Sequence, residues 1–253
     1  MRGARIDRVT LRRPDLRTRF PAEFAARLEG QTAIGVERRA KYLLVPLSSG
    51  DTLIMHLGMS GSFQVATSSS SADRIERDRH DHVIFDLSSG ASVAFNDPRR
   101  FGFMDLVATG DLPAHPAIGR LGPEPLSAAF DAFALARACA GKRTSLKAAL
   151  LDQRVVAGLG NIYVSEALHV AGLSPQRQAS TIATPNGSPR DAAYRLAAAI
   201  KSVLEYAIAR AERARFRVYD REAARCRRRG CGGVVRRRTQ GGRSTFYCPG
   251  CQR

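Results

Sequence analysis

Short apolar segments, each about as long as a β-strand, recur through residues 1–110. Val83, Phe85 and Leu87 lie at every second position, which is the period of a strand with one buried face. Residues 67–79 are rich in serine and then in charged residues, a composition that predicts a mobile loop. The pattern predicts hairpins packed as a β-sandwich or flattened barrel, with strands at residues 5–11, 40–47, 52–57, 82–87, 92–96 and 103–107.

Helical periodicity replaces this alternation after the turn sequence Gly-Pro-Glu-Pro-Leu at 122–126. We predict that Ser127 caps a first helix, that a second begins near Thr144, and that a third spans 162–170 after a glycine-rich break. A long helix is predicted at 188–213. The buried faces of these helices are expected to carry Phe130, Phe133, Ala134, Leu146, Ala149, Leu150, Leu196, Ile200, Val203, Leu204 and Ile208.

The order of these segments predicts an α+β chain that begins with a β-sandwich and continues with helices. We place a β-rich domain at 1–110, a helical domain at 111–216 and a small metal-binding segment at 217–253. A chain of this length is long enough for each of the two larger parts to bury its own core.

Composition adds a strong positive charge to this picture. The 253 residues carry a formal net charge of +17, and the isoelectric point is near 10.8. Such a charge favours a polyanionic partner, because basic side chains displace the counterions condensed on phosphates; a merely arginine-rich protein is the alternative. The sequence has no apolar run of the ~20 residues that a membrane span needs and no signal peptide, so we expect a cytoplasmic protein with no membrane partner.

Four of the five cysteines lie close to the end of the chain. Their spacing is C-x4-C-x16-C-x2-C, which is typical of two thiolate pairs that hold one zinc ion in a tetrahedron. We therefore predict one structural zinc ion bound by Cys226, Cys231, Cys248 and Cys251. The fifth, Cys139, lies in a helical pattern and is predicted to be a small core residue.

The segment between the cysteine pairs predicts a zinc ribbon. Residues 234–239 and 244–247 have strand character and flank a Gln-Gly-Gly turn. Eleven arginines and only two acids lie between Arg217 and the end of the chain, so the ribbon is expected to contact phosphates. Arg243 stands at the hairpin tip, where it could enter a groove of a nucleic acid or make one more phosphate contact.

Several motifs, in order along the whole chain, resemble the formamidopyrimidine-DNA glycosylase family. Six motifs in one order make a chance resemblance implausible. The motifs are Arg-Arg-Ala-Lys-Tyr-Leu-Leu at 38–44, His-Leu-Gly-Met-Ser-Gly at 56–61, Asp-Pro-Arg-Arg-Phe-Gly at 97–102, Gly-Pro-Glu-Pro-Leu at 122–126, Gly-Asn-Ile-Tyr at 160–163 and Thr-Phe-Tyr-Cys at 245–248.

The resemblance implies a bacterial base-excision repair enzyme. Such an enzyme removes oxidised purines, including 8-oxoguanine and formamidopyrimidines, from duplex DNA and cuts the strand on both sides of the abasic sugar. The implied fold is a β-sandwich, a helical domain with a helix–two-turn–helix motif and a zinc ribbon. The implied partner is double-stranded DNA with an oxidised base or an abasic site, bound by a monomer near the bacterial nucleoid.

The resemblance also assigns candidate DNA contacts. An enzyme that rotates a base out of the helix must fill the gap that it leaves. Phe101 can wedge between base steps, Met59 is a flexible apolar filler, and Arg99 can hydrogen-bond the orphaned base, as the matching family residues do. From the residues alone, Phe101 is a plausible core residue and the Asp-Pro sequence at 97–98 a plain turn.

Five further candidates follow from the same resemblance. Lys41 would contact DNA at the lesion and assist proton transfer during β-elimination, and Arg243 would act in the second, δ-elimination. Because arginine is a poor acid, we interpret Arg243 as a phosphate and charge-stabilising group. His80, Lys142 and Asn161 match family DNA contacts. An ordinary solvated surface position is the alternative for each.

The beginning of the sequence departs from the family pattern. The family begins Met-Pro-Glu, and its proline amine attacks the sugar, whereas this sequence begins Met-Arg-Gly-Ala-Arg at 1–5. A mis-assigned start is the explanation that we favour, because the downstream motifs are intact. The alternatives are a protein that binds damaged DNA without glycosylase activity, and a weak lyase that uses Lys41 or another amine.

Overall fold

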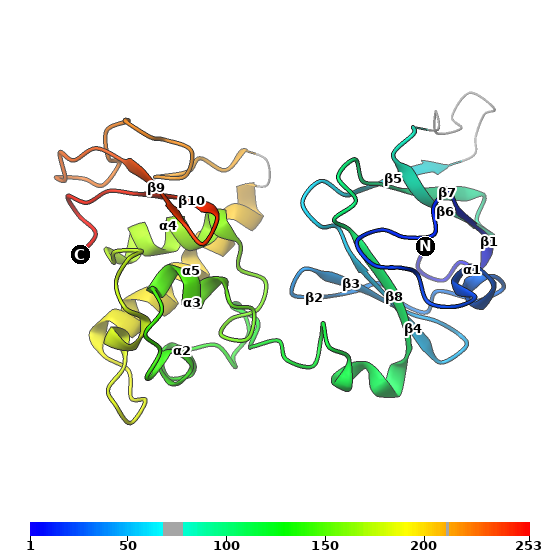
Figure 1. Ribbon diagram of the computed structural model, residues 1–253, viewed down its shortest axis with the longest axis horizontal. Helices are drawn as coiled ribbons and strands as arrows, with labels where there is room; N and C mark the ends of the chain where they lie inside the picture. Colours follow the sequence, from blue (N-terminus) through cyan, green and yellow to red (C-terminus); the bar gives the residue numbers. More distant parts are fainter. Residues whose placement is uncertain (68–77, 211–212) are drawn as a thin grey trace. The chain divides into compact units, whose positions relative to one another are not determined.

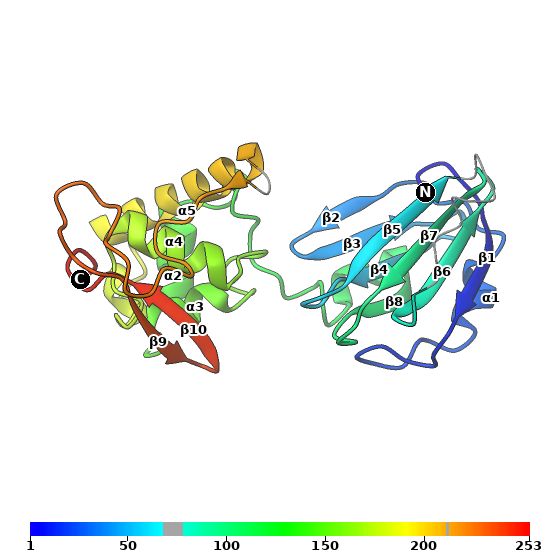
Figure 2. The same ribbon diagram turned by 90° about the horizontal axis from the view of Figure 1, so that it is seen from above.

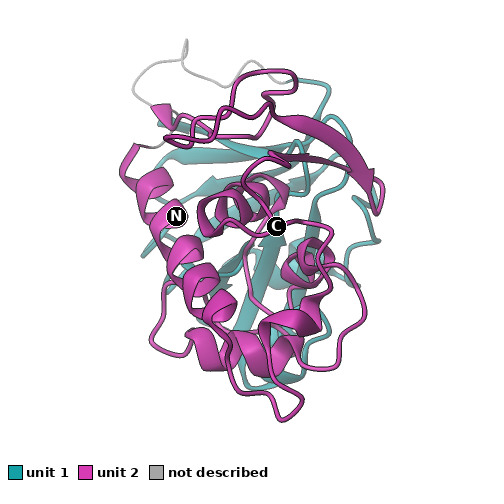
Figure 3. Ribbon diagram, turned by 90° about the vertical axis from the view of Figure 1, so that its left-hand side faces the viewer, with its two compact units in different colours: residues 1–119 teal, residues 120–253 magenta. Residues whose placement is uncertain are grey.

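The computed structural model describes residues 1–67, 78–210 and 213–253. The chain forms two compact units, residues 1–119 and 120–253 (Figures 1 and 3). The ribbon belongs to the second unit together with the helices. The sequence-based division into segments 1–110, 111–216 and 217–253 stays a prediction.

The first unit is built from two four-stranded antiparallel sheets, stacked as the layers of a sandwich (Figure 2). The strand order is β1-β6-β7-β5 in one sheet and β2-β3-β4-β8 in the other. The bounds are β1 Ile6–Leu11, β2 Glu37–Arg39, β3 Tyr42–Pro46, β4 Asp51–His56, β5 Ser62–Thr67, β6 Asp81–Leu87, β7 Ala91–Asn96 and β8 Phe103–Ala108.

Alternating apolar residues from both sheets meet in one core. Val45 and Leu53 contribute from one sheet and Phe85 and Phe95 from the other, all almost fully buried. Helix α1 (Phe24–Leu28) adds Phe24 and Leu28 to this core. Apolar side chains at every second position therefore form the predicted sandwich.

Two strands and one α-helix of this unit escaped the sequence analysis. Strand β2 is polar throughout, strand β5 exposes most of its residues, and helix α1 has only one turn of sequence pattern. The predicted strand at 40–47 begins only at Tyr42, because residues 40 and 41 form the turn that joins β2 to β3. Most of the predicted loop at 67–79 lies outside the described residues.

The second unit packs helices around its own apolar core, which includes Cys139 as predicted. Helices α2 to α5 span Ala132–Cys139, Leu146–Leu151, Asn161–Ala171 and Asp191–Arg210, and the 3-10 helix η2 spans Ala179–Ile182. A further 3-10 helix, η1 (Thr109–Ala114), belongs to the first unit. Helix α4 ends at Ala171, and the next residue, Gly172, caps it in a left-handed conformation (φ 72°).

Three details of the helical prediction are wrong. Phe133, expected on a buried face, is 48% exposed, because α2 turns Leu135 and Ala136 towards the core instead. The cap of α2 is Asp131, whose Oδ1 accepts a hydrogen bond from the Ala134 amide at 2.7 Å, because the helix starts later than Ser127. Ile208 is 69% exposed, because the last turn of α5 extends beyond the core that buries Leu196 and Ile200.

The ribbon is a two-stranded hairpin, with β9 at Arg236–Gln240 and β10 at Arg243–Tyr247. Gly241 and Gly242 form its two-residue turn with φ of 55° and 72°, values that glycine adopts without strain. Its apolar core contains only Val218, Val235 and Phe246, with Tyr219 packed beside them. No helix among the described residues is long and apolar enough to cross a membrane.

Candidate nucleic-acid interface and metal centre

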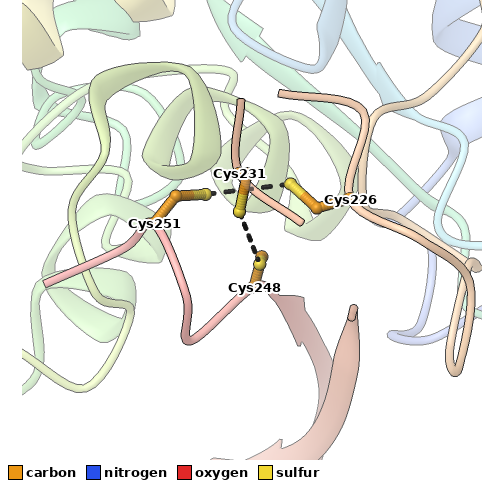
Figure 4. A group of neighbouring side chains, drawn as sticks. All are labelled: Cys226, Cys231, Cys248 and Cys251. Atoms are coloured by element: carbon orange, nitrogen blue, oxygen red, sulfur yellow. Dashed lines mark hydrogen bonds between the residues drawn. The ribbon is translucent and has the colours of Figure 1, made fainter. Parts of the chain in front are cut away.

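The four cysteines of the ribbon converge on one point (Figure 4). Their sulfur atoms all lie within 4.8 Å of one another; the Sγ atoms of Cys226 and Cys251 are 3.8 Å apart, and those of Cys231 and Cys248 are 3.6 Å apart. Zinc–sulfur bonds of about 2.3 Å in a tetrahedron place sulfurs about 3.8 Å apart. The four thiols therefore fit one zinc ion, as the spacing predicted.

A buried histidine of α4 touches this centre. His169 is fully buried, and its Nε2 lies 3.2 Å from the Cys226 sulfur. Burial, followed by the nearby charge of Arg228, lowers the pKa of His169 to about 4, so the ring is neutral at pH 7. A neutral ring with its proton on Nε2 donates to the thiolate, an arrangement that orients a metal ligand. The sequence pattern gave no sign of this contact.

Two further contacts secure the ribbon to α4. The carboxylate of Glu166, which is 4% exposed, accepts hydrogen bonds from three successive backbone amides at 217–219, over 2.7 to 2.9 Å. Arg228 donates to the carbonyl oxygens of His169 and Val170, the latter at 3.0 Å, in the last turn of α4. Helix α4 is therefore the support on which the ribbon rests.

The hairpin tip is held by two polar side chains from the helical part of the unit. Lys147, which is 1% exposed, donates from Nζ to the Ser244 carbonyl at 3.1 Å and to Thr245 Oγ1 at 2.6 Å. Asn161 donates from Nδ2 to the same Ser244 carbonyl at 2.9 Å. Neighbouring Arg243 is exposed at the start of β10, so its side chain is accessible while its backbone is fixed.

Lys147 was missed by the sequence analysis although a signal was present. It lies on α3 between Leu146 and Leu150, which are fully buried. Burial, with a smaller contribution from the charge of Arg243, lowers its pKa to about 8. A lysine within the buried face of a short helix indicates a specific partner, here the hairpin tip.

Lys142 and Asn161 are the other two candidates of this unit. Lys142 is half-buried in the turn after α2, where its amide donates to the Cys139 carbonyl at 3.1 Å. Asn161 is the first residue of α4 and is half-buried. The structure thus brings Asn161, Lys147 and Arg243 together.

In the first unit, three candidates come from two adjoining loops. Met59 lies between β4 and β5 and is 73% exposed, and Phe101 lies between β7 and β8 and is 42% exposed. The Arg99 guanidinium lies over the Phe101 ring, 4.7 Å from its centroid. Phe101 is therefore not a core residue, and its ring and Arg99 form one exposed group.

These two loops contact each other through their backbones. Gly58 has a φ of 67°, and a Cβ at this position would lie 2.4 Å from the Phe101 carbonyl carbon. A Cβ at Gly102 would lie 2.5 Å from the Phe95 ring of the core. The glycines of both motifs therefore allow a close approach that a side chain would prevent.

Lys41 and His80 lie on other segments of the same unit. Lys41 is exposed in the two-residue turn between β2 and β3, which corrects its predicted place inside a strand. It lies near enough to His56 to help lower the pKa of that ring, after the larger effect of burial. His80 is half-buried just before β6, and its amide donates to Asp78 Oδ1 at 3.1 Å.

Comparison with known proteins relates both units to one family. The formamidopyrimidine-DNA glycosylase N-terminal domain matches residues 1–104, and the H2TH domain of formamidopyrimidine-DNA glycosylase matches residues 121–217. The formamidopyrimidine-DNA glycosylase of Rhodopseudomonas palustris strain HaA2 is 56% identical over 275 residues, covering 100% of this chain and 94% of the relative. That of Bradyrhizobium sp. strain BTAi1 is 54% identical with the same coverage.

Solved structures agree with the sequence relatives. Lactococcus lactis Fpg in complex with abasic-site DNA superposes with a TM-score of 0.87 at 27% identity, covering 100% of this chain and 94% of that one. The complex of the Lactococcus lactis protein with FAPY-dG-containing DNA gives a TM-score of 0.86 at 27% identity, with coverage of 99% and 93%. The chain belongs to the formamidopyrimidine-DNA glycosylase family.

Proposed function

We propose that this protein is a base-excision repair DNA glycosylase and abasic-site lyase that acts on oxidised purines in duplex DNA. The observation that carries the proposal is the exposed group of Met59, Arg99 and Phe101 on two loops whose backbones lie in close contact, in a chain whose relatives are formamidopyrimidine-DNA glycosylases. Such a group suits the gap that remains when a base is rotated out of the stack.

The three side chains have complementary chemistry for that gap. The Phe101 ring is flat and apolar, so it can insert between base steps, and Met59 can fill the vacated volume. Arg99 has several donors for the edge of the orphaned base. In the free protein, hydration of the exposed apolar surface of Met59 and Phe101 is unfavourable in free energy. Burial of that surface against DNA would recover this free energy.

The remaining candidates suit contact with the sugar–phosphate backbone. We assign Arg243 to phosphate binding and charge stabilisation at the lesion, and Lys41 to proton transfer during strand cleavage. His80, Lys142 and Asn161 are assigned to phosphate contacts. The zinc ion has a structural role, because four thiolate ligands leave no open position for a substrate.

The proposal extends to partner and location. We infer binding of double-stranded DNA with an oxidised base or an abasic site, by a monomer, in the bacterial cytoplasm near the nucleoid. The formal charge of +17 supports a DNA partner, since basic side chains displace the counterions condensed on DNA phosphates. Such binding weakens steeply as the salt concentration rises.

Borohydride trapping tests the activity. A duplex with 8-oxoguanine opposite cytosine is incubated with two proteins: the 253-residue chain and the same chain restored with the family's N-terminal segment, which begins Met-Pro-Glu. We expect both to bind, and the extended chain to form a covalent adduct through its proline amine. Failure of the extended chain to excise the base would refute the proposed activity.

A further inference from the structure

A buried carboxylate lies beneath the exposed group of the first unit. Asp97 follows β7 directly and is fully buried, whereas Arg99 and Phe101, a few residues later, are exposed. Its Oδ1 accepts a hydrogen bond from Ser60 Oγ at 2.6 Å and a longer one from the Arg99 amide at 3.3 Å. Its Oδ2 accepts from the Gly102 amide at 2.7 Å.

Asp97 thereby joins segments that are distant in sequence. Ser60 belongs to the loop that carries Met59, and Gly102 closes the loop that carries Arg99 and Phe101. The backbone of Asp97 adds a third segment, because its amide donates to the His80 carbonyl at 3.0 Å. The ring of His82 lies 2.9 Å from the Asp97 carbonyl oxygen, to which its Nε2 can donate.

Packing alone orders the exposed side chains only in part. Met59 is 73% exposed and Phe101 is 42% exposed, so their positions depend on the backbone from which they project. Fixed backbones reduce the entropy that is lost when such side chains bind. The turn itself includes Arg100, whose φ of 54° is unusual for a residue with a side chain.

We propose that Asp97 is a positioning residue that holds the Met59 loop, the Arg99–Phe101 loop and the segment before β6 as one rigid lesion-recognition unit. The use of this unit in lesion recognition rests on the proposed function, whereas the coupling of the loops is a property of the DNA-free protein. The carboxylate is required because all three side-chain bonds are accepted by Asp97. An asparagine would place an amide donor opposite one of the donating groups.

Amide hydrogen exchange of the DNA-free protein tests the coupling. We expect Asp97→Asn to speed exchange at 57–61 and 99–102 by about tenfold or more, since a buried donor–donor contact replaces a hydrogen bond. Asp86→Asn is the matched control: this carboxylate accepts from Ser92 Oγ at 2.7 Å on the same sheet, outside these loops. It should leave both loops unchanged.

Ser60→Ala provides a second, milder variant that keeps Asp97 intact. It removes only the bond between the two loops, so faster exchange at 99–102 as well as at 57–61 is expected. Faster exchange confined to 57–61 would overturn the coupling. Because this change leaves the core untouched, the result stands even if Asp97→Asn fails to fold.

Binding to DNA tests how the coupling is used. Affinity is measured at one fixed salt concentration for a duplex with a tetrahydrofuran abasic analogue and for the undamaged duplex of the same sequence. We expect Asp97→Asn to lower the preference for the lesion about tenfold and to leave the affinity for undamaged DNA unchanged, because phosphate contacts are retained. An equal loss for both duplexes would overturn the positioning role.

A double-mutant cycle separates positioning from a general loss of stability. Met59→Ala and Phe101→Ala should be non-additive in lesion binding by the wild-type chain and additive in the Asp97→Asn background. Unchanged non-additivity would contradict the proposal. If the wild-type chain does not prefer the lesion duplex, the proposed function fails, while the hydrogen-exchange result still decides whether Asp97 couples the loops.

Discussion

The two units present exposed candidate DNA contacts on supports of different physical nature. In the first unit, Met59 and Phe101 project from loops that rest on the apolar core between two sheets. In the second, Arg243 projects from a hairpin whose own core has only Val218, Val235 and Phe246. A metal centre and polar contacts to α3 and α4 replace the missing apolar area. An apolar core with one buried carboxylate supports the first group, and a metal with directed polar bonds supports the other.

This difference predicts the largest effect for loss of the metal. Cys248→Ser should abolish stoichiometric zinc binding and unfold the ribbon, because structural zinc contributes on the order of 10 kcal/mol to folding of such small units. Zinc content and hydrogen exchange at 226–251 measure the effect. Strands β3 and β4 should keep their protection, and Cys139→Ala, in the helical core, should keep the zinc. Loss of protection in β3 and β4 would contradict the contrast between the units.

Glu166→Gln is expected to have the next largest effect. The amide of glutamine would face one of the three backbone donors at 217–219, so the second unit should lose about 3 kcal/mol of unfolding free energy. Denaturant unfolding, followed through the second unit, measures it. Glu205→Gln, an exposed change on α5, is the control and should be nearly neutral. Equal stabilities of the two variants would show that α4 does not support the ribbon in this way.

In the first unit, Gly58→Ala should lower the free energy of unfolding by about 2 kcal/mol. The positive φ would be strained with a side chain, and the added Cβ would collide with the backbone of Phe101. Gly50→Ala shares the positive φ, at 86°, but its Cβ would meet nothing within 4 Å. The difference between the two melting temperatures isolates the contact between the loops. If both substitutions cost the same, close packing of the loops contributes nothing to stability.

The smallest effect concerns the pH dependence that Lys147 confers on the second unit. Its pKa falls from 10.5 in the unfolded chain to about 8 in the fold, so burial of the ammonium is penalised most below pH 8. The penalty fades as pH rises from 8 towards 10.5. Relative to Lys147→Met, the wild-type protein should therefore gain about 1 kcal/mol between pH 7 and pH 9. A stability difference independent of pH, measured by denaturant unfolding, would contradict a buried lysine with a lowered pKa.

The parts of the fold that follow from local patterns were predictable. Alternation identified strands such as β6, and the spacing of four cysteines identified the metal centre, because both signals are short in sequence. Strand β2 was missed because Glu37, Arg38 and Arg39 are all polar, and its place in the sheet depends on pairing with β3. Lys41 was misplaced for the same reason: the turn exists only because β2 does.

The supporting contacts of the site were not predictable from the sequence. Lys147 and Ser244 are 97 residues apart, and His169 and Cys226 are 57 apart. The apolar neighbours of Lys147 indicate that it needs a buried partner, but nothing in the local sequence identifies the partner, which is fixed only when the ribbon folds against the helices. The roles of Lys41, Arg243 and the other candidate DNA contacts stay predictions.

Helix α4 also limits the insertions that the second unit can accept, because both of its ends contact the ribbon. Asn161 meets the hairpin tip and His169 meets the metal ligands, a span of about 12 Å at 1.5 Å per helical residue. From Ser244 on β10 to Cys248, the residue after its end, the chain covers about 13 Å at 3.3 Å per extended residue, so helix and strand match in length. If each strand of the hairpin were two residues longer, α4 would have to lengthen by about one helical turn, or about four residues, to keep both contacts. Insertions in relatives should therefore occur in these linked steps, or in the loops outside this pair.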